Sequence, residues 1–223
     1  MLITRIAIGS AIAAFAAAFG GAAPVTQRPA VVHRIAPAPM PAGNPLKGFI
    51  AYDAPANFPH SMEWFSLPVN SVQTGEHTFD WTALEAKLNE AAGRGNQACF
   101  RFYYDYPHEA TGIPAYLLEP GEAQLPRRAY TDYGGGQSPD YNGGSPGSIR
   151  FRQSMREFIA ALGAKYDGDP RIGFITVGLL GFWGEWHTYP HEDWTPNEDV
   201  MNMVLNSFVS AFRKTRLEVR YPA

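Results

Sequence analysis

A glutamate between two tryptophans is the first group in this sequence whose surroundings indicate chemistry. Glu185 lies in segment 181–187, GFWGEWH, with Trp183 and Trp186 on either side and His187 two residues on. Apolar ring faces desolvate a carboxyl group and raise its pKa, as a general acid near neutral pH requires. We therefore take Glu185 as the candidate catalytic residue and Trp183, Trp186 and His187 as candidate substrate contacts. The alternative is a Glu185 that only caps or salt-bridges within its loop.

A second polar and aromatic cluster occupies 101–106, RFYYDY. Side chains alternate between the two faces of a strand, so Arg101, Tyr103 and Asp105 point the same way. A charge, a phenol and a carboxylate would then project together, and we include Tyr104 with them as candidate substrate-binding residues. An ion pair between Arg101 and Asp105 is the structural alternative.

Two further acids precede this cluster. Glu63 lies inside a predicted strand, where a charge needs a partner, and Arg101 is the partner we expect. A role of Glu63 as a substrate ligand is equally open. Asp53 follows the first predicted strand and is a weaker candidate for substrate contact.

Other chemistries find less support. His187 and His191 have a spacing that resembles zinc ligation, but Pro190 between them excludes the helical geometry of the zinc-protease motif. Cys99 is expected to be buried within a strand, which argues against a nucleophile. Glycines 134–136 lack the Lys-Ser/Thr of a phosphate loop. We expect no metal and no cofactor.

Alternating strands and helices must position these residues. The predicted strands are 46–52, 61–69, 97–104, 172–180 and 217–221, and the predicted helices begin at Asp80, at Ile149 and at the capping box of residues 195–198. This alternation predicts right-handed parallel units. An open doubly wound sheet and a (β/α)8 barrel both fit. The first strand lacks a Gly-rich phosphate turn, and the elaborate segments follow strand ends, so the pattern favours an α/β fold of the (β/α)8 TIM-barrel type. The long segment 119–147 is expected to form a lid or cleft wall.

The beginning of the chain is typical of an exported protein. Residues 1–23 have a basic start, a short apolar run and small residues for cleavage between Ala22 and Ala23, as in a signal peptide. A Pro/Ala-rich linker, 24–43, precedes the folded part, 44–223. We expect a secreted or periplasmic protein with no stable membrane span after signal cleavage. A net charge of -3 and a pI near 6.1 argue against binding of nucleic acid through a basic face.

Four motifs carry a resemblance. NPLKG (44–48), FDW (79–81), RFYYDYP (101–107) and GEWH (184–187) recur in this order in a secreted microbial family of unknown function. That family resembles clan-A-type glycoside hydrolase barrels. The resemblance implies Glu185 as the acid/base that follows strand four, and a poly- or oligosaccharide as the partner. The clan usually has Asn before this glutamate, where this sequence has Gly184.

The resemblance also implies a nucleophile after strand seven. A closed barrel typically needs about 250 residues, so we expect about the first five strands in 223 residues. The second carboxylate would then come from Asp105, Asp53 or Glu63, or from sequence beyond this chain. A non-catalytic carbohydrate-binding barrel and a truncated fragment without independent activity are the alternatives to a glycoside hydrolase.

Overall fold

The computed structural model describes residues 48–52 and 54–220. The predicted signal peptide, the predicted linker and Asp53 lie outside the described residues. Within the described part, no helix has the length and apolar character needed to cross a membrane.

Five parallel strands form the central sheet. They are β1 (Ile50–Tyr52), β2 (Met62–Pro68), β5 (Gln97–Tyr103), β8 (Ile172–Thr176) and β9 (Arg216–Glu218). Their order in the sheet, β1-β2-β5-β8-β9, is their order along the chain, and every neighbouring pair is parallel. The expected α/β fold with a parallel sheet is therefore confirmed for the described residues, in which β1 and β9 are the two edges.

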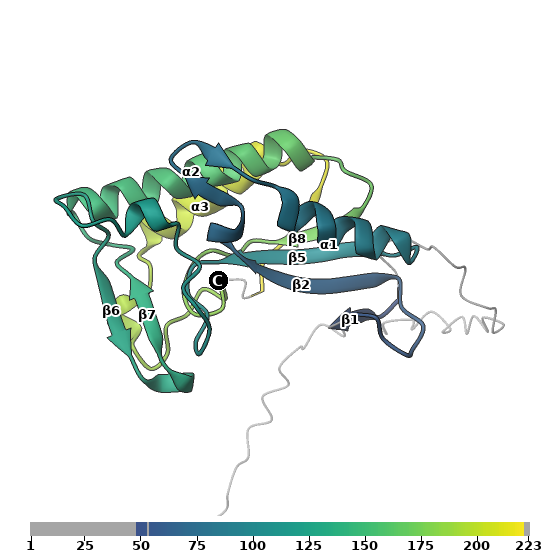
Figure 1. Ribbon diagram of the computed structural model, residues 1–223, viewed down its shortest axis with the longest axis horizontal. Helices are drawn as coiled ribbons and strands as arrows, with labels where there is room; N and C mark the ends of the chain where they lie inside the picture. The colour runs from purple at the N-terminus through teal and green to yellow at the C-terminus, as the bar shows by residue number, and fades with distance from the viewer. Residues whose placement is uncertain (1–47, 53, 221–223) are drawn as a thin grey trace, which may run out of the picture. The chain divides into compact units, whose positions relative to one another are not determined.

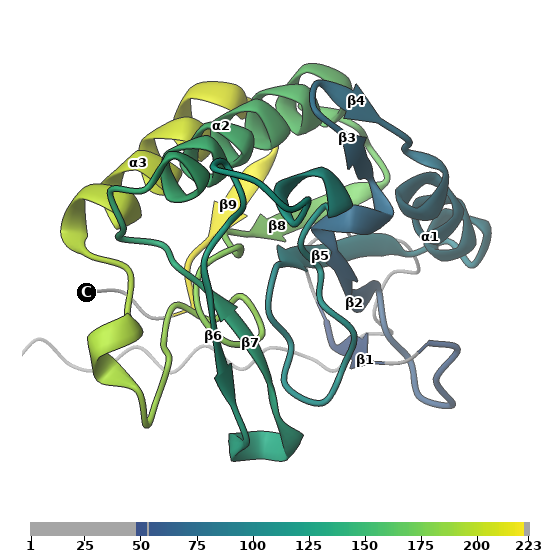
Figure 2. The ribbon, with the colours of Figure 1, turned by 60° about the vertical axis from the view of Figure 1, so that its left-hand side comes forward.

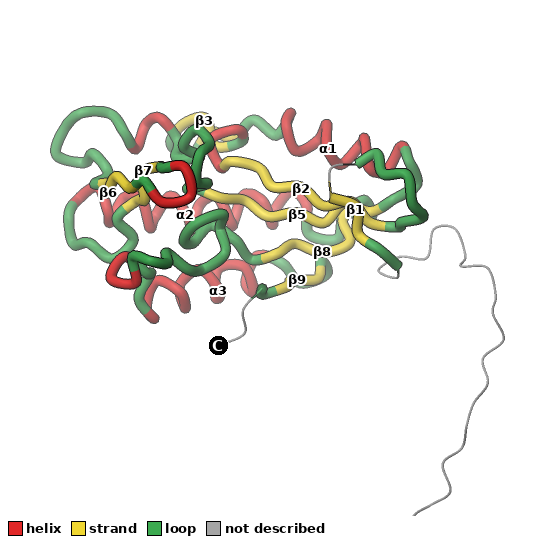
Figure 3. Tube along the Cα trace, turned by 90° about the horizontal axis from the view of Figure 1, so that it is seen from below, coloured by secondary structure: helices red, strands yellow, loops and turns green. Residues whose placement is uncertain are grey.

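Three helices cover one face of this sheet, as Figures 1 and 2 show. They are α1 (Thr82–Gly93), α2 (Pro146–Tyr166) and α3 (Glu198–Ala211). The opposite face lies in front of the helices in Figure 3, and we call it the open face. A doubly wound sheet would reverse its strand order and place helices on both faces. Sequential order with helices on one face is instead the arrangement of barrel-type folds.

Short hairpins and turns fill the connections. β3 (Gln73–Gly75) pairs with β4 (Thr78–Phe79), and β6 (Arg127–Tyr130) pairs with β7 (Gly136–Pro139). Single 3-10 turns occur at Val69–Ser71, Ala115–Leu117, Asp132–Gly134 and Glu192–Trp194. The β6–β7 hairpin lies within the segment predicted as a lid or cleft wall, and it extends away from the helices in both Figures 1 and 2.

The core lies between the helices and the sheet because alternate side chains of each strand face the helices. On β5, Phe100 and Phe102 belong to this core, whereas Arg101 is buried outside it. Phe102 packs edge-on against Phe158 of α2, with ring centroids 4.9 Å apart. The period of two thus puts Arg101 on the open face, opposite to Phe100 and Phe102.

Helix starts differ in part from the predictions. α2 begins at Pro146 because the Ser145 hydroxyl accepts a hydrogen bond from the Ser148 amide at 3.1 Å. The predicted capping box at α3 is wrong. Asn197 is the cap, and its Oδ1 accepts from the Val200 amide at 3.0 Å. The hydroxyl of Thr195 is instead bonded to another threonine in the preceding loop.

Candidate functional site

The loop after β8 carries Glu185, and several residues of this loop have a left-handed backbone conformation. Leu179, Trp183 and Trp186 have φ values of 76°, 55° and 66°, a region that non-glycine residues rarely adopt and that is enriched at functional sites. Gly184 also has a positive φ, and a Cβ there would lie 2.8 Å from the Phe102 carbonyl oxygen. The loop therefore requires glycine at 184, where the resembling clan has Asn.

Two arginines hold the Glu185 carboxylate. Its Oε1 forms an ion pair with Arg101 Nη2 at 2.9 Å and accepts a hydrogen bond from Arg220 Nη1 at 2.6 Å, and the glutamate side chain is 13% exposed. The Arg101 guanidinium also lies 5.4 Å from the centre of the Trp64 ring. Because Arg101 projects from the open face of β5, Glu185 is positioned over that face, next to the carboxyl ends of the strands.

The two tryptophans are not arranged as predicted. Trp186 Nε1 donates to the carbonyls of Val177 (2.8 Å) and Gly178 (3.2 Å), and its ring packs against the core. Trp183 lies in a separate aromatic cluster, 5.0 Å from the Tyr133 ring. The expectation that ring faces define the setting of Glu185 is therefore wrong, since guanidinium groups hold its carboxylate.

His187 lies at the edge of this arrangement. Its Nε2 is 3.9 Å from Glu185 Oε2 and its ring is 5.7 Å from the ring of Trp183. Burial lowers the pKa of His187, and the Glu185 carboxylate partly offsets that effect. His187 therefore lies beside the candidate catalytic residue.

A cavity of about 170 Å³ lies beside the two arginines. It is lined by Ile50, Tyr52, Trp64, Arg101, Thr176, Glu218 and Arg220. Glu218 adds a second carboxylate, and its Oε2 accepts from the Thr176 hydroxyl at 2.6 Å. Glu218 and Arg220 are not among the site residues predicted from the sequence. The alternation Arg-Leu-Glu-Val-Arg over 216–220 is the signal that could have found them, because it places every second, charged residue on one face.

Asp105 has its own environment. It is 3% exposed, and the Tyr130 hydroxyl donates to its Oδ1 at 2.6 Å. Burial raises the pKa of Asp105 to about 6, although the hydrogen bond from Tyr130 opposes this shift. The alternative of an Arg101–Asp105 ion pair is wrong, since Arg101 pairs with Glu185.

Glu63 lies at the amino end of β2, away from the loop that carries Glu185. Its carboxylate accepts two hydrogen bonds from Arg94, at 2.8 and 2.6 Å, and one from Asn96 at 2.8 Å. The predicted pairing with Arg101 is therefore wrong. The contacts from Arg94 lower the pKa of Glu63 although burial opposes them, as expected for a structural ion pair.

The two tyrosines of the second cluster separate. Tyr103 ends β5 on the same side as Arg101, and its ring lies 4.9 Å from that of Tyr106. Tyr104 is fully buried in the core, with its ring 4.7 Å from that of Phe151. The structure therefore places Tyr103 near the strand end and Tyr104 away from the open face.

The remaining candidates have other contacts. His191 stacks on Trp194 at 3.8 Å and bonds Asp132 at 2.8 Å. No group of three His, Cys, Asp or Glu side chains that could hold a metal occurs within residues 48–52 and 54–220. Cys99 is buried, and burial raises its thiol pKa to about 12, which does not favour a nucleophile.

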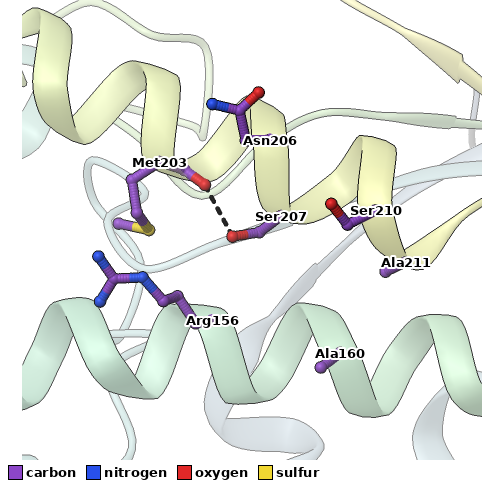
Figure 4. A pocket seen from close by; sticks show the side chains of 7 residues that line it. All are labelled: Arg156, Ala160, Met203, Asn206, Ser207, Ser210 and Ala211. Carbon is purple, nitrogen blue, oxygen red and sulfur yellow. Dashed lines mark hydrogen bonds between the residues drawn. The ribbon is translucent and has the colours of Figure 1, made fainter.

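A larger cavity lies on the helical side of the sheet. About 590 Å³ lies between α2 and α3, lined by Arg156, Ala160, Met203, Asn206, Ser207, Ser210 and Ala211 (Figure 4). The Ser207 hydroxyl is bonded to the Met203 carbonyl of its own helix. This lining contains no carboxylate and belongs to the helical face, so we place the candidate site at Glu185 despite the smaller cavity there.

Comparisons with known proteins identify no family. No family model matches the chain, and no curated protein matches it. Among solved structures, endo-glycoceramidase II from Rhodococcus sp. in a complex with cellobiose-like isofagomine is similar, with 13% identity and a TM-score of 0.45. The similarity covers 70% of this chain and 40% of that one.

Proposed function

We propose that this chain is an exported, carbohydrate-active protein of the glycoside hydrolase type. Oligosaccharide would bind on the open face at the carboxyl ends of the strands, and Glu185 would be the catalytic carboxylate. The observation that carries the proposal is the fixed position of Glu185 between Arg101 and Arg220, on a strand-end loop beside a cavity. The sequential strand order supports the further proposal that the sheet is part of a (β/α)8 barrel.

The cavity offers the groups that sugar recognition requires. Tyr52 and Trp64 present aromatic faces, with ring centroids 5.7 Å apart. Arg101 Nε is buried and has no hydrogen-bond partner among the described residues, so a ligand oxygen would find an unused donor there. Aromatic walls with a few convergent polar groups are typical of small-molecule sites.

Hydrolysis of a glycosidic bond generally uses two carboxyl groups on either side of it. We propose Glu218 as the second one, because it lines the cavity that Arg101 and Arg220 share with it. One carboxylate would attack the anomeric carbon, or activate a water that attacks it. The other carboxyl group would protonate the glycosidic oxygen as it leaves.

Binding without hydrolysis is the second candidate function. The observation in its favour is that both carboxylates already have protein partners: Glu185 pairs with Arg101 and accepts a hydrogen bond from Arg220, and Glu218 accepts one from Thr176. Carboxylates held in this way are suited to accept hydrogen bonds from sugar hydroxyls.

One experiment separates the two functions. The purified chain is titrated calorimetrically with cello-, xylo- and manno-hexaose, and release of reducing sugar from each is followed. For a hydrolase, Glu185→Gln should lower turnover by about 10²- to 10⁴-fold. Glu122→Gln, at an exposed glutamate, is the matched control and should leave turnover unchanged. Binding with no release by the wild type would establish the second candidate, and absence of both would refute the proposal.

Export has its own test. We propose that residues 1–23 are removed, so the mature protein collected outside the cytoplasm should begin at Ala23. N-terminal sequencing of that material measures the cleavage site directly. A protein retained inside the cell with Met1 intact would contradict the proposal.

A further inference from the structure

A second cavity lies where the end of β5 meets the β6–β7 hairpin. Its volume is about 350 Å³, and it is lined by Asp105, Glu109, Thr111, Arg127, Gly136 and Gln137. None of these residues lines the cavity beside Glu185. The lining consists of polar residues and one glycine, so a ligand there would be held by hydrogen bonds.

The buried member of this lining has an unused atom. Asp105 is 3% exposed, and its Oδ1 accepts from Tyr130. Its Oδ2 has no hydrogen-bond partner among the described residues. A buried polar atom without a partner costs free energy and calls for an explanation. A hydroxyl group of a ligand would satisfy it.

The hairpin forms a wall of this cavity in a fixed position. The His108 amide donates to the Gly135 carbonyl at 2.8 Å, which ties the hairpin to the loop after β5. A Cβ at Gly136 would lie 2.3 Å from the Tyr130 hydroxyl, the group that donates to Asp105. Glycine at 136 therefore allows the hairpin to close against this hydroxyl.

We propose that this cavity is a second carbohydrate subsite, which binds a neutral sugar unit through its hydroxyl groups. Asp105 Oδ2 and Glu109 offer acceptors, Arg127 offers donors, and Gln137 offers both. Two acids against one arginine disfavour an acidic sugar. This inference rests on the proposed carbohydrate-binding function, but it concerns residues that the Glu185 site does not use.

The test uses exposed residues of the hairpin, whose truncation should leave the fold intact. Arg127→Ala and Gln137→Ala are titrated with the three hexaoses beside the wild type, Glu185→Gln and the exposed control Arg213→Ala. Each hairpin variant should weaken binding about 3- to 10-fold, the loss expected for one hydrogen bond. Arg213→Ala should bind as the wild type does, and all variants should keep the wild-type melting temperature.

The outcomes distinguish the subsite from the function on which it rests. If the wild type binds a hexaose and neither hairpin variant weakens that binding, the subsite is overturned and the proposed function stands. If no hexaose binds the wild type, both are overturned. Weaker binding by both hairpin variants, with the control unchanged, supports the subsite.

Discussion

The buried carboxyl group of Asp105 should make the stability of this protein depend on pH in a way that one substitution removes. Asp105→Asn keeps an oxygen that can accept the hydrogen bond from Tyr130, and it abolishes ionisation. The wild type and this variant should therefore diverge in stability as the pH rises.

The magnitude follows from the shift of the pKa. Burial raises the pKa of Asp105 from 3.8 to about 6, so the folded state holds its proton more tightly than the unfolded chain does. This contribution to stability is fully present below pH 3.8 and is lost as the pH rises through 6. The whole effect is about 3 kcal/mol, and between pH 5 and pH 8 about 1 to 2 kcal/mol should disappear. Asp105 is 3% exposed, so solvent screens this effect little.

Urea unfolding at pH 5, 6, 7 and 8 measures the divergence. The free energy of unfolding of the wild type minus that of Asp105→Asn should fall by about 1 to 2 kcal/mol across this range. Asp193→Asn, at an exposed aspartate, controls for the loss of one negative charge and should show no such trend. Tyr130→Phe should deepen the trend, because it removes the hydrogen bond that favours the ionised carboxylate.

Parallel stability curves for the wild type and Asp105→Asn would refute this reasoning. They would mean that the carboxyl group has similar pKa values in the folded and unfolded chains, and so is solvated in the folded state. The unpartnered Oδ2 would then be in contact with water, and the argument for a ligand at that atom would fail too.

Four substitutions at three helix positions test the packing and capping. Gly163→Ala should lower the free energy of unfolding by about 1 to 3 kcal/mol, because its Cβ would lie 2.6 Å from the side chain of Ala211 on the adjoining helix. Gly93→Ala is its matched control, with no atom within 4 Å of the new Cβ, and should stabilise the protein by up to about 1 kcal/mol. Asn197→Ala should cost about 1 kcal/mol through loss of the cap on the Val200 amide, and Asn197→Ser should restore most of it. Chemical denaturation of each variant checks these values, and equal stability of the two glycine variants would contradict the packing argument.

The sheet could be predicted from the sequence because its strands are short, mostly apolar segments that alternate with helical patterns. Two predicted strands, 61–69 and 97–104, match β2 and β5 to within one residue at each end. The run 172–180 is also buried, but β8 ends at Thr176 and the chain turns at Leu179, whose φ is positive. The apolar composition indicates burial, whereas Gly178 and Gly181 are the residues that mark the turn.

The contacts between side chains in the site were harder to predict than the residues that belong to the site. The period of two gives the face on which a strand residue lies, and it placed Arg101 correctly. It does not give the end of the strand at which two residues meet. Nor does it give the register between strands, which pairs Glu63 with Ala98 on the helix-facing side, at the amino end of β2 beside Arg94, whereas Arg101 lies on the open face. Arg220 reaches Glu185 only because β8 and β9 are neighbours, which local sequence does not show.

The two ends of the sheet differ in a way that bears on both proposals. At the amino ends, the charges are paired with one another: Glu63 with Arg94 before β5, and Asp169 with Arg171 before β8. At the carboxyl ends lie the left-handed residues of the Glu185 loop and a buried carboxyl oxygen without a partner. Selection for stability alone would favour unstrained backbone at both ends. The concentration of left-handed residues at the carboxyl ends is typical of the ligand-binding edge of a parallel α/β fold, and it is the end where Glu185, Glu218 and Asp105 lie.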